Sequence, residues 1–334
     1  MTQYWPSHDT TRPRPETIAV AVAAAAAAVV AQPPAGAVVL FDGTSLDGWA
    51  ALDGSPAPWQ IVDGTLEVVA RTGDIQTVQQ FGDLQLHIEW CAPTPASGDG
   101  QGRSNSGVFP MGIYEIQVLD SYDNPTYADG YAGAIYGQHP PIFNPTTAPG
   151  AWQVYDIVFR RPRFGDDGAL LAPARLTIFH NGVCVQNNVE LRGPTGWIAP
   201  MAYTAHADAL PLRLQEHGDP LRFRNIWALP LPDPAAVAAP PLPALRSDVL
   251  ADELELYVGR YCRGAWCAVI THETGGLVLH IGGRVLPLDI QQDGRMRVRD
   301  SAALLNFGGS AHSAPTDFTI ALGGGEMHFA RQPE

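Results

Sequence analysis

The chain has 334 residues, of which 46% are hydrophobic and 16% charged, which is enough apolar material for a sizeable core and for more than one domain. Its formal net charge of -14 argues against nucleic acid or an anionic membrane surface as a partner. All 20 basic residues are arginine, which excludes Schiff-base lysine chemistry and a P-loop lysine.

An apolar, alanine-rich run at 18–31 dominates the N-terminal extension, residues 1–37. The run is shorter than the roughly 20 residues that a membrane-spanning helix needs, so no membrane span is predicted. It has the length of a signal-peptide core, although Glu16 at its edge and Pro13 and Pro15 before it are untypical. A loosely docked Ala/Pro tether is an equally good interpretation. The alternation at 17–22 favours a third interpretation, in which this segment is an edge strand. Residues 17–31 are then candidates for self-association, because an edge strand can pair with a neighbouring copy.

Short alternating runs bounded by Gly, Asp and Pro fill the segment 38–230 and predict many strands. Strands at such regular spacing, with no persuasive helical period, indicate an all-β domain of the β-sandwich or jelly-roll type. The strands are expected at 38–41, 58–62, 65–70, 75–79, 84–91, 106–110, 113–119, 153–160, 175–180, 183–185, 211–215 and 221–228.

A Pro/Ala-rich linker at 231–246 separates a second unit, residues 247–334. Ser247 and Asp248 are suited to cap a short helix over 249–259, after which hairpins predict a small antiparallel β-barrel or sandwich. Its strands are expected at 265–271, 277–281, 284–290, 295–299, 303–307, 317–322 and 326–330.

Four cysteines are too few for a disulfide scaffold. Cys262 and Cys267 are close enough to pair in an oxidising compartment, but four structural thiols are the favoured interpretation. No redox or zinc motif includes them.

Polar side chains recur on one face of two predicted strands. Glu115 and Gln117 share a face, with Asp120 at the strand's end, and Arg213, Gln215 and His217 share a face on another strand. Each residue alone is best explained as part of a solvated sheet face. Together these residue types are suited to orienting sugar hydroxyls and moving protons. The neighbouring segments add an amide, two aromatic rings and a guanidinium: Asn105, Tyr136, Trp152 and Arg224.

Oxygen-bearing side chains at Asp123, Asn124, Asp129 and Asn144 suit a divalent cation such as Ca²⁺, but the EF-hand pattern is absent. The metal is therefore left open, and no cofactor is required by the sequence.

Nine short motifs follow one another in order between residues 38 and 230: 40–49 (LFDGTSLDGW), 59–64 (WQIVDG), 81–89, 105–107 (NSG), 114–120 (YEIQVLD), 133–136 (GAIY), 149–152 (PGAW), 181–182 and 214–226. On these motifs the segment 38–230 resembles the 3-keto-disaccharide hydrolase family, whose members are also described as 3-keto-glucoside lyase/hydratase domains. It departs from the family pattern at Gln153, which follows Trp152, and in a long loop at 160–174, and both departures can alter the cleft.

The resemblance implies a concanavalin A-like β-sandwich and activity on 3-keto-glycosides or related oligosaccharides. Residues 8–15 look like the segment that precedes this domain in relatives after an export signal, which implies an exported protein. The implied reaction is abstraction of the C2 proton of the 3-keto sugar, elimination of the C1 substituent, and hydration of the product. Glu115, Asp120 and His217 are the candidates for its base, acid or metal ligand, and the sequence does not divide these roles. The expected substrate-binding residues are Asn105, Gln117, Tyr136, Trp152, Gln215 and Arg224.

Arg224 has two interpretations, because it is also placed to pair with Glu115 across the sheet. Two other function classes stay open for the chain: a carbohydrate-binding module without turnover, and a surface or assembly protein that adds its N-terminal arm to a neighbour. Convergence of Glu115, Asp120 and His217 in one cleft would favour the enzyme.

Overall fold

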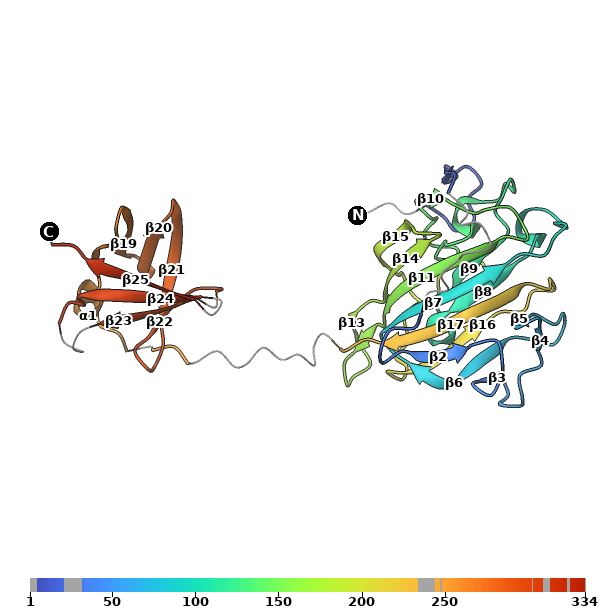
Figure 1. Ribbon diagram of the computed structural model, residues 1–334, viewed down its shortest axis with the longest axis horizontal. Helices are drawn as coiled ribbons and strands as arrows, with labels where there is room; N and C mark the ends of the chain where they lie inside the picture. Colours follow the sequence, from blue (N-terminus) through green and yellow to red (C-terminus); the bar gives the residue numbers. More distant parts are fainter. Residues whose placement is uncertain are drawn as a thin grey trace. The chain divides into compact units, whose positions relative to one another are not determined.

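The structure is a computed structural model that describes residues 5–20, 32–233, 244–246, 248–301, 303–308, 313–322 and 325–333. The chain divides into two compact units, Met1–Ala236 and Val237–Glu334 (Figure 1). Most of the alanine run predicted at 18–31, and most of the linker predicted at 231–246, lie outside the described residues.

Unit 1 is built on two antiparallel sheets. The larger has eight strands in the order β15-β14-β11-β7-β17-β5-β4, with β2 paired to β17. Its strands are β2 (Val38–Phe41), β4 (Gln60–Val62), β5 (Thr65–Glu67), β7 (Leu84–Cys91), β11 (Trp152–Arg160), β14 (Arg175–His180), β15 (Val183–Glu190) and β17 (Arg222–Pro230).

The smaller sheet has five strands in the order β3-β6-β16-β8-β9 and lies behind the larger one in Figure 1. Its strands are β3 (Trp49–Ala51), β6 (Ile75–Phe81), β8 (Ser106–Phe109), β9 (Ile116–Val118) and β16 (Leu210–Leu214). Two short pairs complete the unit: β1 (Glu16–Thr17) with β10 (Phe143–Asn144), and β12 (Arg163–Phe164) with β13 (Leu170–Ala172).

Strand alternation produces the sandwich core. In β7, Leu84, Leu86, Ile88 and Trp90 are fully buried between the sheets, and the residues between them face outwards. β9 and β16 place Ile116 and Leu212, among others, against the same core. Burying a large apolar side chain contributes about 1.5–3 kcal/mol, so this two-sheet core is the main source of the unit's stability. The predicted β-sandwich is confirmed.

An ion network covers the outer face of the larger sheet. His87 Nδ1 lies 2.7 Å from Asp156 Oδ1, and Arg224 Nε donates to Glu89 Oε2 at 2.6 Å. Burial alone would lower the pKa of His87, but the carboxylates of Asp156 and Glu89 outweigh burial and raise it to about 9. Burial works to raise the pKa of Glu89, but hydrogen bonds with His87, Asn225 and Arg224 lower it to about 2.

The His87 imidazolium should make the stability of unit 1 depend on pH. Its folded-state pKa lies above the ordinary value of 6.5, so its contribution is complete below pH 6.5 and is lost as the pH rises through about 9. Between pH 6.5 and 9.5 we expect the free energy of unfolding to fall by about 2–3 kcal/mol more in wild type than in His87→Gln. Urea unfolding followed by tryptophan fluorescence measures this difference. The signal reports mainly on unit 1, because Trp266 is the only one of the eight tryptophans in the sequence that lies after residue 236. Parallel pH curves for the two proteins would contradict the prediction.

Unit 2 is a closed barrel of eight antiparallel strands, which settles the choice between barrel and sandwich. The helix predicted over 249–259 is shorter, α1 (Ala251–Glu255), because residues 256–258 turn the chain into the first barrel strand, which begins at Gly259. The strands are β18 (Gly259–Arg263), β19 (Trp266–Glu273), β20 (Gly276–Ile281), β21 (Arg284–Ile290), β22 (Met296–Val298), β23 (Leu304–Gly308), β24 (Asp317–Leu322) and β25 (Gly325–Arg331).

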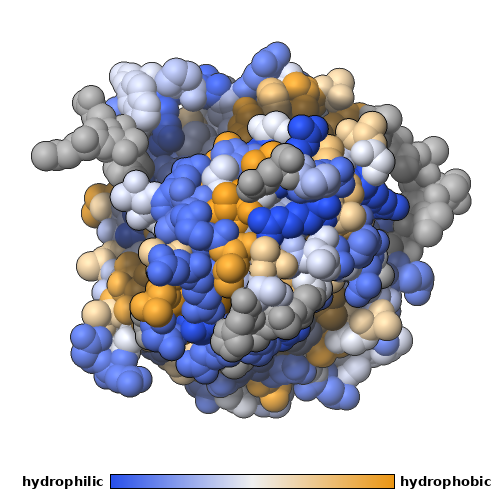
Figure 2. Space-filling view, turned by 90° about the vertical axis from the view of Figure 1, so that its left-hand side faces the viewer, coloured by the Kyte–Doolittle hydropathy of each residue, from blue (hydrophilic) through white to orange (hydrophobic). Residues whose placement is uncertain are grey.

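Cys262 and Cys267 form a disulfide between β18 and β19, so the favoured prediction of four free thiols is wrong. Pairing of adjacent strands brings the two residues opposite each other, which the spacing alone did not decide. The barrel exposes some large apolar side chains, and Figure 2 shows hydrophobic residues in patches among hydrophilic ones. Trp266 and Val285 are examples.

Within the part of the chain that the structure describes, no helix has the length and apolar character needed to cross a membrane.

Candidate active site

A cavity of about 650 Å³ opens on the face of the five-stranded sheet that points away from the core. Its volume is typical of small-molecule sites, which occupy about 300–1,000 Å³. The lining residues are His8, Gln101, Gly102, Asn105, Phe109, Glu115, Gln117, Tyr127, Tyr136, Thr195, Trp197, Arg213, Gln215 and His217.

Three adjacent strands and the residues that extend them form the cavity floor. Arg213 pairs with Phe109 across β16 and β8, and Gly107 pairs with Gln117 across β8 and β9. Gly107 is needed at the centre, because a Cβ there would lie 2.5 Å from the Phe109 ring and 3.1 Å from Glu115 Oε1. The predicted alternation of Glu115 and Gln117, and of Arg213, Gln215 and His217, thus brings both sets into one cavity.

Glu115 is the buried acid of the site. Its side chain is 6% exposed, and its backbone N–H donates to Thr195 Oγ1 at 2.9 Å. Burial raises the pKa of Glu115 to about 8, with Arg213 acting to lower it and Asp74 to raise it. At neutral pH the carboxyl group is therefore mostly protonated, as a general acid must be.

Amides beside Glu115 form a hydrogen-bonded frame. Gln117 Nε2 donates to Gln101 Oε1 and to Asn105 Oδ1, both at 3.1 Å, and Asn105 Nδ2 donates to the Gln101 carbonyl at 2.8 Å. Gln117 Oε1 is buried and has no partner among the described residues. A buried acceptor left without a hydrogen bond is costly, so this oxygen is suited to receive a ligand hydroxyl.

Arg213 supplies the cavity's positive charge. Its guanidinium lies 4.0 Å from the Phe109 ring centroid and 3.5 Å from Asp74 Oδ2. Its Nε is buried and unpartnered within the described ranges. His217, on the extension of the same strand, is exposed, and the structure shows no hydrogen bond to its ring in the described chain. Both groups are therefore available to a bound molecule.

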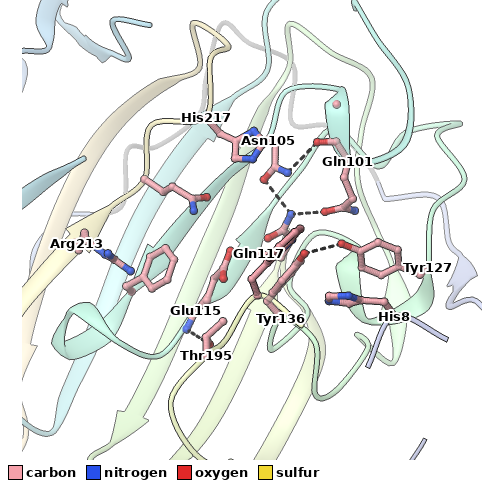
Figure 3. Close-up of a pocket in the computed structure, with 14 residues that line it drawn as sticks. His8, Gln101, Asn105, Glu115, Gln117, Tyr127, Tyr136, Thr195, Arg213 and His217 are labelled. Carbon is pink, nitrogen blue, oxygen red and sulfur yellow. Dashed lines mark hydrogen bonds between the residues drawn. The ribbon is translucent and has the colours of Figure 1, made fainter. Parts of the chain in front are cut away.

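Loops and the N-terminal segment form the remaining walls. Tyr127 and Tyr136 lie with their hydroxyl oxygens 2.6 Å apart, and the His8 ring packs on both. Trp197 lines the mouth and is 81% exposed. Figure 3 shows Glu115 and Gln117 between the His217 and Arg213 side of the cavity and the side that carries His8 and Tyr127.

Three predicted site residues lie outside the cavity lining. Asp120 is buried beyond the end of β9 and pairs with Arg103 at 2.7 Å, because the strand ends at Val118. Trp152 and Arg224 lie on the outer face of the other sheet, where the guanidinium is 4.1 Å from the Trp152 ring. The suggested Arg224–Glu115 pair is wrong, since Arg224 pairs with Glu89.

Three of the four side chains suggested as oxygen ligands for a cation have their oxygens engaged by the protein. Asn124 Oδ1 accepts from the Gly100 N–H, the Asp129 carboxylate from the His8 N–H, and Asn144 Oδ1 from the Thr146 hydroxyl. The fourth, Asp123, is exposed. Among the described residues no group of three or more His, Cys, Asp or Glu is arranged to hold a metal ion.

The lining residues that sequence reasoning left out come mostly from loops. Gln101, Tyr127, Thr195, Trp197 and His8 follow no strand alternation, so periodicity gave no signal for them. Arg213 had a signal, because it shares a strand face with Gln215 and His217.

A family model described as a 3-keto-alpha-glucoside-1,2-lyase-like domain matches residues 36–229, more than half of the chain. The chain belongs to this family. The resemblance stated from the sequence motifs is thereby confirmed. No curated protein matches the chain.

The family has a similar solved structure, a protein of Parabacteroides distasonis ATCC 8503 provisionally described as a glycosyl hydrolase. It is 46% identical, covers 59% of this chain and 85% of its own, and superposes with a TM-score of 0.58. A second protein of that organism, with the same description, is 18% identical over 59% of this chain and 94% of its own, with a TM-score of 0.44. The family match and the first likeness support a carbohydrate-active enzyme.

Proposed function

We propose that the protein cleaves 3-keto-glycosides by elimination and hydration in the cavity of unit 1. One observation carries the proposal. Glu115 and His217 are about a hundred residues apart in the sequence, yet they line one cavity together with amides and a guanidinium. The family to which the domain belongs supports the substrate class.

The proposed reaction begins with removal of a proton from C2 of the sugar. The C3 ketone acidifies that proton, and His217 takes it as the general base. The enolate then expels the C1 substituent, and Glu115, mostly protonated at neutral pH, gives its proton to the leaving oxygen. Water adds across the C1–C2 double bond, returning hydrogen to C2 and placing a hydroxyl group on C1. No electrons are gained or lost overall.

The enolate oxygen needs a positive charge or hydrogen-bond donors. Arg213 takes this role in our proposal, replacing Arg224, because the Arg213 guanidinium lines the cavity. Gln117, Asn105, Gln215 and Tyr136 remain the proposed contacts to sugar hydroxyls.

Export of the protein remains part of the proposal. The disulfide Cys262–Cys267 in the barrel supports it, because disulfides persist mainly in oxidising compartments.

Incubation with 3-keto-lactose and 3-keto-trehalose, with and without EDTA, tests the function by release of the free sugar. Turnover in wild type supports the proposed function, and loss of turnover in EDTA would show that the reaction also requires a divalent cation. Absence of turnover on both substrates, together with measurable saccharide affinity, would instead favour a carbohydrate-binding module.

Trp197 should act as a platform for a sugar ring at the cavity mouth. It lines the cavity while 81% exposed, so replacing it leaves the core intact. Since an aromatic contact is worth about 0.5–1.5 kcal/mol, Trp197→Ala should raise KM for 3-keto-lactose about 2- to 12-fold with kcat nearly unchanged. Steady-state kinetics measure this, with Trp197→Phe as the control that keeps a ring. Equal KM values in wild type and Trp197→Ala would show that Trp197 does not bind the sugar ring.

A further inference from the structure

The N-terminal strap, defined as residues 7–18, is bound to the sandwich at several points. Ser7 Oγ donates to the Gly137 carbonyl, and the His8 N–H donates to both Asp129 carboxylate oxygens at 3.2 Å. Arg12 Nη1 donates to the Gln138 carbonyl at 3.3 Å. Further on, β1 pairs in parallel with β10. The strap precedes the family domain, which begins at residue 36, yet it forms part of the cavity wall.

The bonds that hold the strap do not use the His8 imidazole. They come from the His8 backbone and from the side chains of Ser7 and Arg12. The ring packs on Tyr127 and Tyr136, with centroids 4.5 and 5.1 Å away, and faces the cavity (Figure 3). A phenylalanine ring would pack on Tyr127 and Tyr136 equally well. The ring packing therefore does not explain why this position carries an imidazole.

Two features of His8 are energetically unfavourable. Its φ of 61° lies in the left-handed region, which costs a non-glycine residue about 1–3 kcal/mol. Its Nε2 is buried without a hydrogen-bond partner among the described residues, although an unmade buried hydrogen bond also costs about 1–3 kcal/mol. Two such costs at one cavity-lining residue are typical of a position that serves a ligand.

The other lining groups define what that ligand would offer. Gln117 Oε1 and Arg213 Nε are also buried and unpartnered within the described ranges, so the cavity presents one free acceptor and one free donor besides the imidazole nitrogen. A sugar ring carries several hydroxyl groups, each of which donates and accepts. Such a hydroxyl satisfies His8 Nε2 in either tautomer of the neutral ring.

We propose that His8 is a saccharide-binding residue whose Nε2 hydrogen-bonds a sugar hydroxyl, so that the functional site extends into the strap. The inference rests on the proposed function for the class of ligand, but it needs no turnover. In this proposal the strap contacts the substrate directly, in addition to forming one wall of the cavity.

Two variants of the full chain separate the hydrogen bond from packing. His8→Phe keeps the aromatic contact with Tyr127 and Tyr136 and loses the nitrogen, whereas His8→Gln restores a polar group. Isothermal titration with lactose, which lacks the C3 ketone needed for elimination, measures affinity alone. We expect His8→Phe to weaken lactose binding about 3- to 10-fold, as for one lost hydrogen bond, and His8→Gln to recover part of the loss. Equal thermal midpoints in wild type and His8→Phe would confirm that folding is unaffected.

The imidazole itself gives a second measurement. The Nε2 resonance that is present in wild type and missing in His8→Phe should shift when lactose is added. Unchanged affinity in His8→Phe with a stationary resonance overturns the inference, and so does a wild type that binds no saccharide. A wild type that binds lactose through His8 but does not cleave 3-keto-lactose supports the inference while the proposed reaction fails.

Discussion

Replacing Glu115 by Gln should lower kcat/KM for 3-keto-lactose by about 10²- to 10⁴-fold, the usual contribution of a general acid. Glutamine has nearly the same shape and the same neutral charge as the protonated acid, but it has no proton to give to the leaving oxygen. Steady-state release of the free sugar measures the loss. Glu67→Gln, the same chemical change at a residue outside the cavity lining, is the matched control and should retain wild-type kinetics.

The pH dependence of this variant gives a sharper test. Because burial raises the pKa of Glu115 to about 8, wild-type kcat/KM should fall as the pH rises through 8 and the acid form is lost. The raised folded-state pKa also means that the buried carboxylate weakens the fold as the pH rises from 4.5 towards 8. Glu115→Gln should therefore be more stable than wild type at pH 9. Full activity in the variant would remove Glu115 from the mechanism.

His217→Ala should also lower kcat/KM by about 10²- to 10⁴-fold, because it removes the proposed base. His217 is exposed, so added imidazole can diffuse into the space and should restore part of the rate. His272→Ala is the matched control, since His272 belongs to the separate barrel. Unchanged rates in His217→Ala, with wild type active, would assign the base to another group and leave the family membership untouched.

Alternation in the sequence predicted most of the strands and half of the site, but it missed β18 and short strands such as β3. The expected strand 84–91 matches β7, and the shared faces of Glu115 with Gln117 and of Arg213 with His217 became the cavity floor. The reason is physical: a pleated strand turns successive side chains to opposite faces, so the pattern records which residues lie together.

The same alternation does not identify the sheet to which a strand belongs. Trp152 and Arg224 alternate correctly, but their strands lie in the eight-stranded sheet, with these side chains facing away from the core. Asp120 follows a strand that ends two residues earlier, so its direction was not set by the pleat. Loop residues such as Trp197 carry no periodic signal, and their positions depend on contacts distant in sequence.

The position of His8 affects the choice of fragment for laboratory work. A recombinant piece trimmed to the family match at 36–229 would retain every residue of both sheets except Pro230, but it would omit the strap. Its cavity would then have Tyr127 and Tyr136 uncovered on the side where His8 packs. Weak or absent activity in such a truncated sample would reflect the missing wall, so substrate screens need a sample that starts no later than Ser7.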